Sequence, residues 1–269
     1  EGVRRAKGEL LPHIRRDGRA VLNADDPHLR VLAAACPVPV PFFGEDPAAA
    51  VRAREIAVAA AETRFVLELP DGQTPVTLPT PGRFMVANAL AAAAVGHLLG
   101  LSPAVIRAGL EAFAPVAGRL RVIATPAGWQ LIDDTYNANP ASMAAAIRTL
   151  AEAPGRRRAI LVAGDMRELG PAAPDLHREV GRIAAAAGID LLFAAGAHAP
   201  EVAAGALAGG LGAAAVQVAA VEEIPAALAP LLQPGDWVLV KGSRAMGMER
   251  VVQGLLAPFA IEAQPGGHR

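Results

Sequence analysis

From residue 121 to the end of the chain, short apolar runs alternate with longer stretches in which apolar and polar residues are mixed. Short apolar runs bounded by turn residues are typical of buried strands, and the longer stretches have the length of helices. The runs that predict strands are 121–125, 129–133, 159–163, 191–195, 214–218 and 237–240. The stretches that predict helices are 142–152, 175–187, 200–207, 222–231 and 246–256. Strands that alternate with helices indicate an α/β fold with a parallel, doubly wound sheet.

The pattern before Gly118 is less regular, so we place a domain boundary there and expect two domains, 1–117 and 118–269. The apolar run 19–23 ends in the turn-forming sequence Asn-Ala-Asp-Asp-Pro, and a helix follows to about residue 36. The remaining predictions are an edge or extended segment at 37–41, a hairpin or meander at 56–78, and helices at 86–99 and 103–113.

The composition excludes some classes of protein. The 269 residues are 53% hydrophobic and 19% charged, which is enough apolar material for buried cores. The net charge of -1 gives no electrostatic basis for binding nucleic acid or an anionic membrane surface. The uncharged stretches 84–106 and 202–221 owe their length to Ala and Gly, so we expect buried elements and no membrane insertion. The single cysteine, Cys36, fits a reducing compartment, and we expect a cytoplasmic monomer.

Polar residues gather directly after several of the predicted strands in the second half of the chain. Ligands of open α/β sheets bind beyond the carboxyl ends of the strands, so these clusters form the predicted site. They are Asp-Asp-Thr-Tyr-Asn-Ala-Asn-Pro at 133–140, Gly-Asp-Met-Arg-Glu-Leu-Gly at 164–170, Gly-Ala-His at 196–198 and Lys-Gly-Ser-Arg at 241–244. Each cluster alone is also compatible with a capped turn, but all of them should lie along one rim of the sheet.

Lysine is rare in this chain: of 25 Lys and Arg residues, only Lys7 and Lys241 are lysine. Lysine can lose its proton and act as a nucleophile, whereas arginine stays protonated. Chance survival of two surface lysines is the simpler explanation, so this pattern alone leaves their role open.

Several common sites are absent from the sequence. It has no G-x-x-x-x-G-K-[ST] phosphate loop and no G-x-G-x-x-G after a strand. The six His and one Cys lack zinc-ligand spacing, and no G-x-S-x-G elbow occurs. Hydrolase, dehydrogenase and zinc functions are therefore disfavoured.

The motifs resemble those of the Mur ligases, in the branch that adds D-Ala-D-Ala to a cell-wall precursor. The clusters at 133–140, 164–170 and 241–244 are similar to three motifs of that family and occur in the same order. The upstream matches are Ala-Lys-Gly-Glu at 6–9, Asn-Ala-Asp at 23–25, Pro-Gly-Arg at 81–83, Asn-Ala-Leu at 88–90 and Gly-Arg-Leu at 118–120. The resemblance implies part of a Mur ligase central ATPase domain, 1–117, followed by a Rossmann-like, doubly wound C-terminal domain, 118–269.

The same resemblance implies an ATP-dependent amide ligase of peptidoglycan precursor synthesis. ATP would phosphorylate the terminal carboxylate of UDP-MurNAc-tripeptide, and the amine of D-Ala-D-Ala would attack the acyl phosphate. Mg²⁺ and protein cations would neutralise the opposing negative charges. The expected cofactors are therefore ATP and Mg²⁺, and the expected partners are UDP-MurNAc-tripeptide and D-Ala-D-Ala.

Residue roles carry over only where the motifs match. Lys7 matches a lysine that family members carbamylate, which turns an amine into an oxygen ligand for Mg²⁺. Asn88 matches an adenine-contacting amide, Asp134 a ribose-binding carboxylate, and Arg119 an arginine that reaches the nucleotide phosphates. Lys7, Arg119 and Lys241 are the expected catalytic residues. The residues expected to face the acceptor dipeptide or the acyl phosphate are Asn137, Asn139, Asp165, Lys241, Ser243 and Arg244.

The sequence also departs from the family pattern. Pro-Gly-Arg-His-Asn is Pro-Gly-Arg-Phe-Met at 81–85, so nucleotide contacts there are weakened or replaced by stacking on Phe84. The UDP-binding domain, the phosphate loop and the upstream Mg²⁺ ligands are missing from this sequence, so we expect the chain alone to be inactive. Two alternatives stay open. One is a diaminopimelate- or lysine-adding Mur ligase, whose acceptor motif should differ at 164–170. The other is a non-catalytic α/β binding module.

Overall fold

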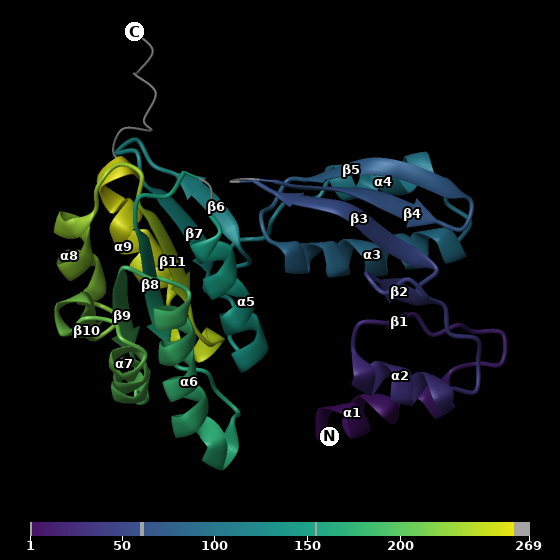
Figure 1. Ribbon diagram of the computed structural model, residues 1–269, viewed down its shortest axis with the longest axis horizontal. Helices are drawn as coiled ribbons and strands as arrows, with labels where there is room; N and C mark the ends of the chain where they lie inside the picture. Colours follow the sequence, from purple (N-terminus) through teal and green to yellow (C-terminus); the bar gives the residue numbers. More distant parts are fainter. Residues whose placement is uncertain (1, 60–61, 154, 261–269) are drawn as a thin grey trace, which may run out of the picture. The chain divides into compact units, whose positions relative to one another are not determined.

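The computed structural model describes residues 2–59, 62–153 and 155–260, and the chain divides into two compact units, Glu1–Ala114 and Pro115–Arg269 (Figure 1). Within the described ranges, no helix has the length and apolar character required to cross a lipid bilayer. The uncharged stretches 84–106 and 202–221 are divided among shorter elements, and they are only partly buried, since Leu99 is 75% exposed and Val218 54%.

The first unit is built on a sheet in the strand order β1-β2-β3-β4-β5. The strands are β1 (Leu22–Asn23), β2 (Phe42–Gly44), β3 (Val51–Val58), β4 (Thr63–Leu69) and β5 (Gly72–Leu78). β1, β2 and β3 run parallel, and β3, β4 and β5 run antiparallel, which confirms the predicted meander. Its hairpin turn lies at Pro70 and Asp71, because Leu69 pairs with Gly72. The segment 37–41 is extended, and its Pro41 carbonyl accepts a hydrogen bond from Leu22 N.

Alternation along β4 explains why this sheet has one buried face. Phe65, Leu67 and Leu69 are buried on one side, where helix α3 packs against β2, β3 and β4. Residues of α3 spaced by three and four positions, such as Val86, Leu90 and Ala93, complete this core. The helical elements of the unit are α1 (Gly2–Gly8), η1 (Leu11–His13), α2 (Pro27–Ala34), α3 (Arg83–Leu98) and α4 (Pro103–Glu111).

The second unit is built on a sheet in the order β10-β9-β8-β11-β7-β6. The strands are β6 (Arg121–Ala124), β7 (Gln130–Asp134), β8 (Ala159–Gly164), β9 (Leu191–Ala195), β10 (Val216–Val218) and β11 (Trp237–Lys241). The strands from β7 to β11 pair in parallel, as predicted. β6 is the exception, because it pairs antiparallel with β7 through a turn closed by Thr125 N and Trp129 O. A parallel connection needs a crossover of a dozen or more residues, and this link is too short.

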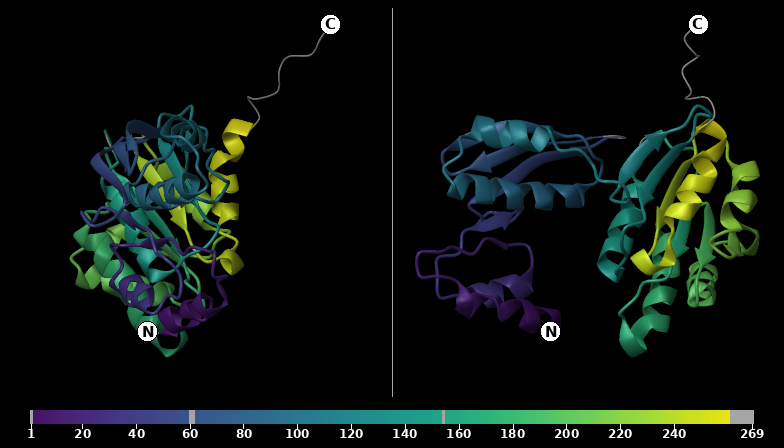
Figure 2. Two further views of the ribbon diagram at one scale, coloured as in Figure 1. Left: turned by 90° about the vertical axis from the view of Figure 1, so that its right-hand side faces the viewer. Right: turned by 180° about the vertical axis from the view of Figure 1, so that it is seen from behind.

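Helices cover both faces of the second sheet, which confirms the doubly wound arrangement (Figures 1 and 2). They are α5 (Pro140–Ala151), α6 (Ala173–Ala186), α7 (Ala199–Ala208), α8 (Ile224–Leu228) and α9 (Glu249–Ala260), with 3-10 turns η2 (Gly170–Ala172), η3 (Ala213–Ala215), η4 (Ala229–Leu231) and η5 (Arg244–Met246). Val238 and Val240 of β11 pack in one core cluster with α8 and α9. Leu239 lies between them in sequence and therefore faces the other layer, formed by α5, α6 and α7.

Two glycines allow α6 and α7 to pack at very short range. A Cβ atom at Gly205 would lie 1.8 Å from the carbonyl oxygen of Arg178, and one at Gly181 would lie 2.0 Å from that of Val202. Any larger residue would push the helices apart. This close approach places His177 of α6 against His198, the residue just before α7.

Candidate functional site

The polar clusters of the second unit lie along one rim of its sheet, as expected. β9, β8, β11 and β7 are neighbours and run parallel, so the segments that follow them leave the sheet at the same edge. The chain passes from β7 to β8 and β9 and only later returns to place β11 between β8 and β7. Such a reversal of strand order opens a crevice at the carboxyl ends, where α/β proteins bind ligands.

An ion pair between Lys241 and Asp134 lies at the centre of this rim. The two residues are register partners on β11 and β7, so their side chains leave the same face of the sheet. Lys241 Nζ lies 2.6 Å from Asp134 Oδ2 and 2.8 Å from the backbone oxygen of Asn137. The Lys241 side chain is only 3% exposed and that of Asp134 is 13% exposed. A lysine at this position is therefore a buried charge with a fixed partner.

The pKa of the Asp134 carboxyl is raised above its usual value. Burial is the largest cause, because it disfavours the charged form, and the positive charge and hydrogen bond of Lys241 oppose it. Loss of water around the carboxylate thus outweighs the attraction of the nearby ammonium group. The packing of the sheet holds the two charged groups together, and their attraction does not fully compensate the carboxylate for the loss of water.

The carboxylates of β7 also hold the segment before β6 in place. Asp133 Oδ2 accepts a hydrogen bond from Gly118 N at 3.0 Å, and Asp134 Oδ1 accepts one from Leu120 N at 3.2 Å. Gly118 and Leu120 have positive φ angles of 76° and 49°, so the backbone folds tightly here. Arg119 lies between these two anchored amides, and its exposed side chain projects from a fixed turn.

Two arginines of the rim share one aromatic ring. The guanidinium carbon of Arg119 lies 4.1 Å from the centroid of the Tyr136 ring, and that of Arg244 lies 5.7 Å from it. Both distances are within the range of cation–π attraction. All three side chains are exposed, so they present positive charge to solvent at the rim.

The segments after β8 and β9 are joined by the buried carboxylate of Asp165. Its oxygens accept hydrogen bonds from Ala197 N at 2.9 Å and His198 N at 3.0 Å. Asp165 is 2% exposed, and its backbone oxygen accepts a hydrogen bond from Ser243 N at 2.9 Å. Ser243 Oγ in turn accepts one from Arg167 N at 2.8 Å. Asp165 and Ser243 therefore tie three neighbouring segments together.

His177 of α6 holds the segment after β8 in place through a hydrogen bond to its backbone. Its Nε2 accepts a hydrogen bond from Met166 N at 2.8 Å, which makes Nδ1 the protonated nitrogen that donates to Ala173 O at 2.7 Å. The ring is buried and stacks on His198 with 4.5 Å between ring centroids. An imidazole in this arrangement is neutral and acts as a fixed acceptor.

The two asparagines of the 133–140 cluster have different roles in the fold. Asn139 is the N-cap of α5: its Oδ1 accepts from Ser142 N at 2.8 Å, and its own N donates to Ser142 Oγ at 3.0 Å. Asn137 supplies the backbone oxygen that binds Lys241, and its side chain is exposed. Lys241, Asp134 and Asn137 are thus brought together, whereas Asn139 begins the next helix.

The remaining predicted residues, Lys7 and Asn88, belong to the first unit. Lys7 is exposed in the last turn of α1. Among the described residues, no group of three or more His, Cys, Asp or Glu could hold a metal ion.

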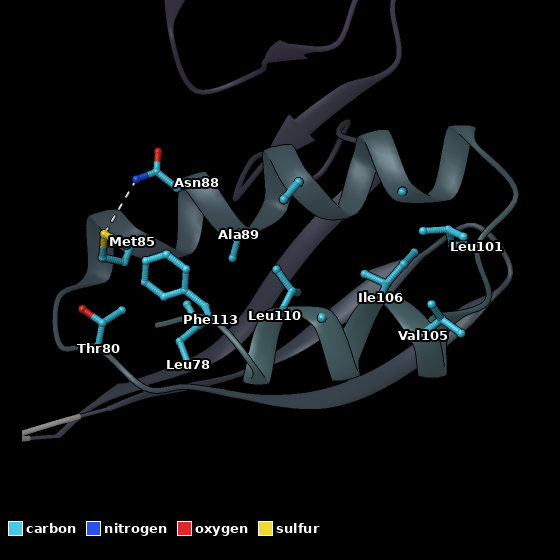
Figure 3. Close-up of a pocket in the computed structure, with 13 residues that line it drawn as sticks. Leu78, Thr80, Met85, Asn88, Ala89, Leu101, Val105, Ile106, Leu110 and Phe113 are labelled. Carbon is cyan, nitrogen blue, oxygen red and sulfur yellow. Dashed lines mark hydrogen bonds between the residues drawn. The ribbon is translucent and has the colours of Figure 1, made fainter. Parts of the chain in front are cut away.

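Asn88 lies beside an apolar cavity of about 500 Å³ between α3 and α4 (Figure 3). Figure 3 shows Asn88, Met85, Phe113 and Thr80 at one end of it and Leu101, Val105 and Ile106 at the other. Thr80 is 1% exposed, and within the described part of the chain its hydroxyl oxygen has no hydrogen-bond partner. Phe84 does not line the cavity, so Phe113 is the aromatic ring available for stacking there.

Sequence reasoning missed four residues that shape these sites. Tyr136 and Asp133 are in a cluster that was singled out, but neither was assigned a role, although a lone tyrosine among arginines is a usable signal. His177 carried no signal in the sequence, because its partner Met166 N is a backbone group. Phe113 follows a helix by two residues, and only the packing of α4 beside α3 brings it to Asn88.

Two family models match the chain. The Mur ligase middle domain matches residues 1–96, and the Mur ligase glutamate ligase domain matches residues 118–244. The UDP-N-acetylmuramoyl-tripeptide–D-alanyl-D-alanine ligase of Escherichia coli is 39% identical over 257 residues, which cover 94% of this chain and 55% of that protein. The enzyme of the same name from Mycobacterium bovis is 35% identical over 277 residues, covering 96% of this chain and 54% of that protein.

Solved structures agree with this relationship. A crystal structure of MurF from Acinetobacter baumannii superposes with a TM-score of 0.85 at 34% identity, covering 95% of this chain and 55% of that one. The MurF ligase of Thermotoga maritima, crystallised in complex with ADP, superposes with a TM-score of 0.81 at 25% identity, covering 96% and 58%. The chain thus spans about half the length of the relatives it matches (55% of the E. coli protein). From the two domain models, the shared motifs and this similarity along nearly its whole length, the chain belongs to the Mur ligase family.

Proposed function

We propose that this chain forms part of an ATP-dependent ligase that adds D-Ala-D-Ala to UDP-MurNAc-tripeptide. The observation that carries the proposal is the rim of the second sheet. There the buried Lys241–Asp134 pair, the fixed turn that presents Arg119 and the Asp165–Ser243 link meet at the carboxyl ends of adjacent strands. This arrangement provides positive charge and ordered amides at the position where ligands of α/β sheets bind.

The proposed reaction has two steps. The terminal carboxylate of the tripeptide takes the γ-phosphoryl group of ATP and releases ADP. The amine of D-Ala-D-Ala then attacks the acyl carbon, loses a proton and displaces phosphate, so that one amide bond forms. The contribution of the rim is to offset negative charge and to hold the reacting groups in place.

For the nucleotide, the proposal assigns a residue to each part. Arg119 engages the phosphates, and Asp134 accepts a hydrogen bond from the ribose through a lone pair that Leu120 N and Lys241 leave free. Asn88 contacts the base at the cavity of the first unit. The unpartnered Thr80 hydroxyl and the Phe113 ring fit a heteroaromatic ligand, which offers both a flat face and polar edge atoms.

Mg²⁺ is proposed at Lys7 in its carbamylated form. A carbamate supplies two oxygen atoms, which are ligands that this cation prefers. The described residues do not complete a coordination shell around Lys7, so no catalytic step is assigned to the ion here.

Asn137, Ser243 and Arg244 are proposed to face the acceptor dipeptide or the acyl phosphate. Asp165 and Asn139 are proposed there too, and because their carboxylate and amide oxygens accept hydrogen bonds from backbone amides, they also order the segments that meet the dipeptide. We further propose a cytoplasmic monomer that binds no nucleic acid and does not insert into the membrane, consistent with the near-zero net charge of -1.

The test is to express the longer open reading frame that contains this chain and to measure phosphate release from ATP. Release should require both UDP-MurNAc-tripeptide and D-Ala-D-Ala. Diaminopimelate or lysine in place of the dipeptide should give none, and the 269-residue chain alone should be inactive. Turnover with diaminopimelate or lysine would instead support the amino-acid-adding ligase. No turnover with any acceptor would support the binding module.

A further inference from the structure

Tyr136 is the only tyrosine of the chain, and its ring lies beside two guanidinium groups that come from different segments. Arg119 precedes β6, whereas Arg244 follows β11 by three residues, so 125 positions separate them in the sequence (244 minus 119). Strand order alone brings them to one ring. The ring is 43% exposed, so it is not a buried core residue whose main role is packing.

Among the residues that the structure describes, neither Arg119 nor Arg244 has an anionic partner. Within residues 2–59, 62–153 and 155–260, neither guanidinium forms an ion pair, whereas Arg158 and Arg250 of the same unit pair with Asp236 and Glu222. Two uncompensated positive charges near one another repel. The electron-rich face of an aromatic ring offsets part of that repulsion.

The backbones of both arginines are also fixed. Gly118 N and Leu120 N on either side of Arg119 donate to Asp133 and Asp134. Ser243, just before Arg244, is 3% exposed and donates its N to Asp165 O. These hydrogen bonds fix the backbones and leave the long side chains free to rotate. The ring of Tyr136 contacts both guanidinium groups and so restricts the rotation of both side chains.

We propose that Tyr136 is a positioning residue that holds Arg119 and Arg244 as a paired clamp for one oligophosphate anion. The inference deepens the proposed function, on which it rests, because it makes Arg244 a second phosphate ligand beside Arg119. A guanidinium that contacts an aromatic face keeps its in-plane N–H groups available, and these donate in pairs to phosphate oxygens.

A cavity of about 700 Å³ in the second unit reaches Arg244, whereas Arg119 and Tyr136 do not line it. Its charged lining residues are Arg121, Arg244, Asp133 and Glu249, and the Asp133 carboxylate is already engaged with Gly118 N and Thr135 Oγ1. Arg121 adds a third positive charge that forms no ion pair among the described residues. Held cations beside an open cavity bind an anion with less loss of side-chain entropy than free ones.

The experiment titrates inorganic triphosphate into the 269-residue chain at low salt and measures the dissociation constant by calorimetry. Tyr136→Leu, which removes the ring, should weaken binding by about five-fold or more, the scale of a cation–π contact at each arginine. Tyr136→Phe keeps the ring and should bind within about two-fold of the unsubstituted chain. Arg148→Gln is the matched control, because Arg148 is an exposed arginine near the far end of α5 and should leave binding unchanged.

A double-mutant cycle separates positioning from a general loss of stability. Arg244→Gln should weaken binding clearly less in the Tyr136→Leu background than alone, since the ring no longer holds the pair. Melting temperature and circular dichroism check the fold, and Tyr136→Met replaces Tyr136→Leu if that variant does not fold.

Three outcomes would overturn the clamp. They are no measurable triphosphate binding by the unsubstituted chain, equal binding by Tyr136→Leu, and equal losses in Tyr136→Phe and Tyr136→Leu. Ligase turnover of the longer protein is measured separately. If the chain binds triphosphate with the predicted Tyr136 effects but the longer protein shows no turnover, the proposed function is refuted and the clamp stands. If the longer protein turns over but the Tyr136 effects are missing, the clamp is refuted and the proposed function stands.

Discussion

Strand β11 carries a buried ion pair at each end, and the two pairs differ in the number of direct hydrogen bonds that join the partners. At the amino end, Asp236 is fully buried and pairs with Arg158 through two hydrogen bonds, one of them 3.0 Å from Nε to Oδ1. Asp236 Oδ2 also accepts from Gln233 N, and Arg158 also donates to Leu231 O. The hydrogen bond to Asp236 is the main reason that the pKa of Arg158 is raised.

At the carboxyl end, the Lys241–Asp134 pair keeps unused capacity. Lys241 has three donor hydrogens, of which one goes to Asp134 and one to Asn137 O. Each Asp134 oxygen accepts a single hydrogen bond from the described residues. The pair at the amino end, joined by two direct hydrogen bonds, fastens β11 to the start of β8. The pair at the carboxyl end, joined by one, lies at the rim where the proposed function places a ligand.

The largest effect is expected for Lys241→Met in the longer protein. Phosphate release should fall by about 100-fold or more, the scale seen when a group that stabilises developing charge is removed. The unfolding free energy should also fall by about 3 kcal/mol, because a buried carboxylate loses its counter-charge. Urea denaturation and steady-state turnover measure the two effects. Normal turnover in this variant would show that Lys241 does not act in the proposed reaction, and that both ion pairs of β11 have only a structural role.

Asp236→Asn should affect stability alone. The variant keeps the acceptor for Gln233 N but loses the charged partner of Arg158, at a cost of about 2 kcal/mol in the unfolding free energy. Turnover per folded molecule should not change. Glu179→Gln on α6 is the control, since its pair with Arg182 is about half exposed (52% and 51%) and should contribute less than about 0.5 kcal/mol. A loss of turnover greater than the loss of folded protein would contradict a purely structural role.

The smallest expected effect is a pH dependence of the unfolding free energy that arises from Asp134, in the ion pair at the carboxyl end of β11. The pKa of Asp134 is raised in the folded chain, so the folded state binds this proton more tightly than the unfolded state. The contribution of Asp134 to stability therefore increases as the pH falls through its raised pKa, and it levels off below the unfolded value of 3.8. Its slope does not exceed about 1.4 kcal/mol per pH unit.

The comparison for this measurement is the double variant Asp134→Asn/Lys241→Met, which removes both charges. The difference in unfolding free energy between the unsubstituted chain and this variant should rise toward acid pH. A flat difference, or one that rises toward alkaline pH, would show that burial does not dominate the Asp134 carboxyl.

Much of the second unit was predictable because its signals are local. Apolar runs set off by glycine and polar turns located every strand from β6 to β11 and the clusters that follow them. The antiparallel pairing of β6 was not foreseen, although the short link from Thr125 to Trp129 contains the reason. The predicted helix at 222–231 is shorter, because it changes at Ala229 into a 3-10 turn that contains Pro230.

For the site residues too, local features were predictable from the sequence and long-range contacts were not. Asp134 and Lys241 were singled out from their motifs, but their separation of 107 positions hides the contact between them. Asp165 was expected to face a ligand, and whether a carboxylate in a turn points outward or toward neighbouring amides depends on segments elsewhere in the chain. The same holds for the cavity at Asn88, which is lined by Phe113 and not by Phe84.

The sequence by itself determined the α/β class, the order of the motifs and the residue types at the rim, because these depend on neighbours within a few positions. Only the tertiary structure decided that β11 inserts between β8 and β7. That insertion buries Lys241 beside Asp134 and places Arg119 and Arg244 on one ring. The physical reason is that burial and pairing are properties of the packed sheet, in which segments more than 100 positions apart become neighbours.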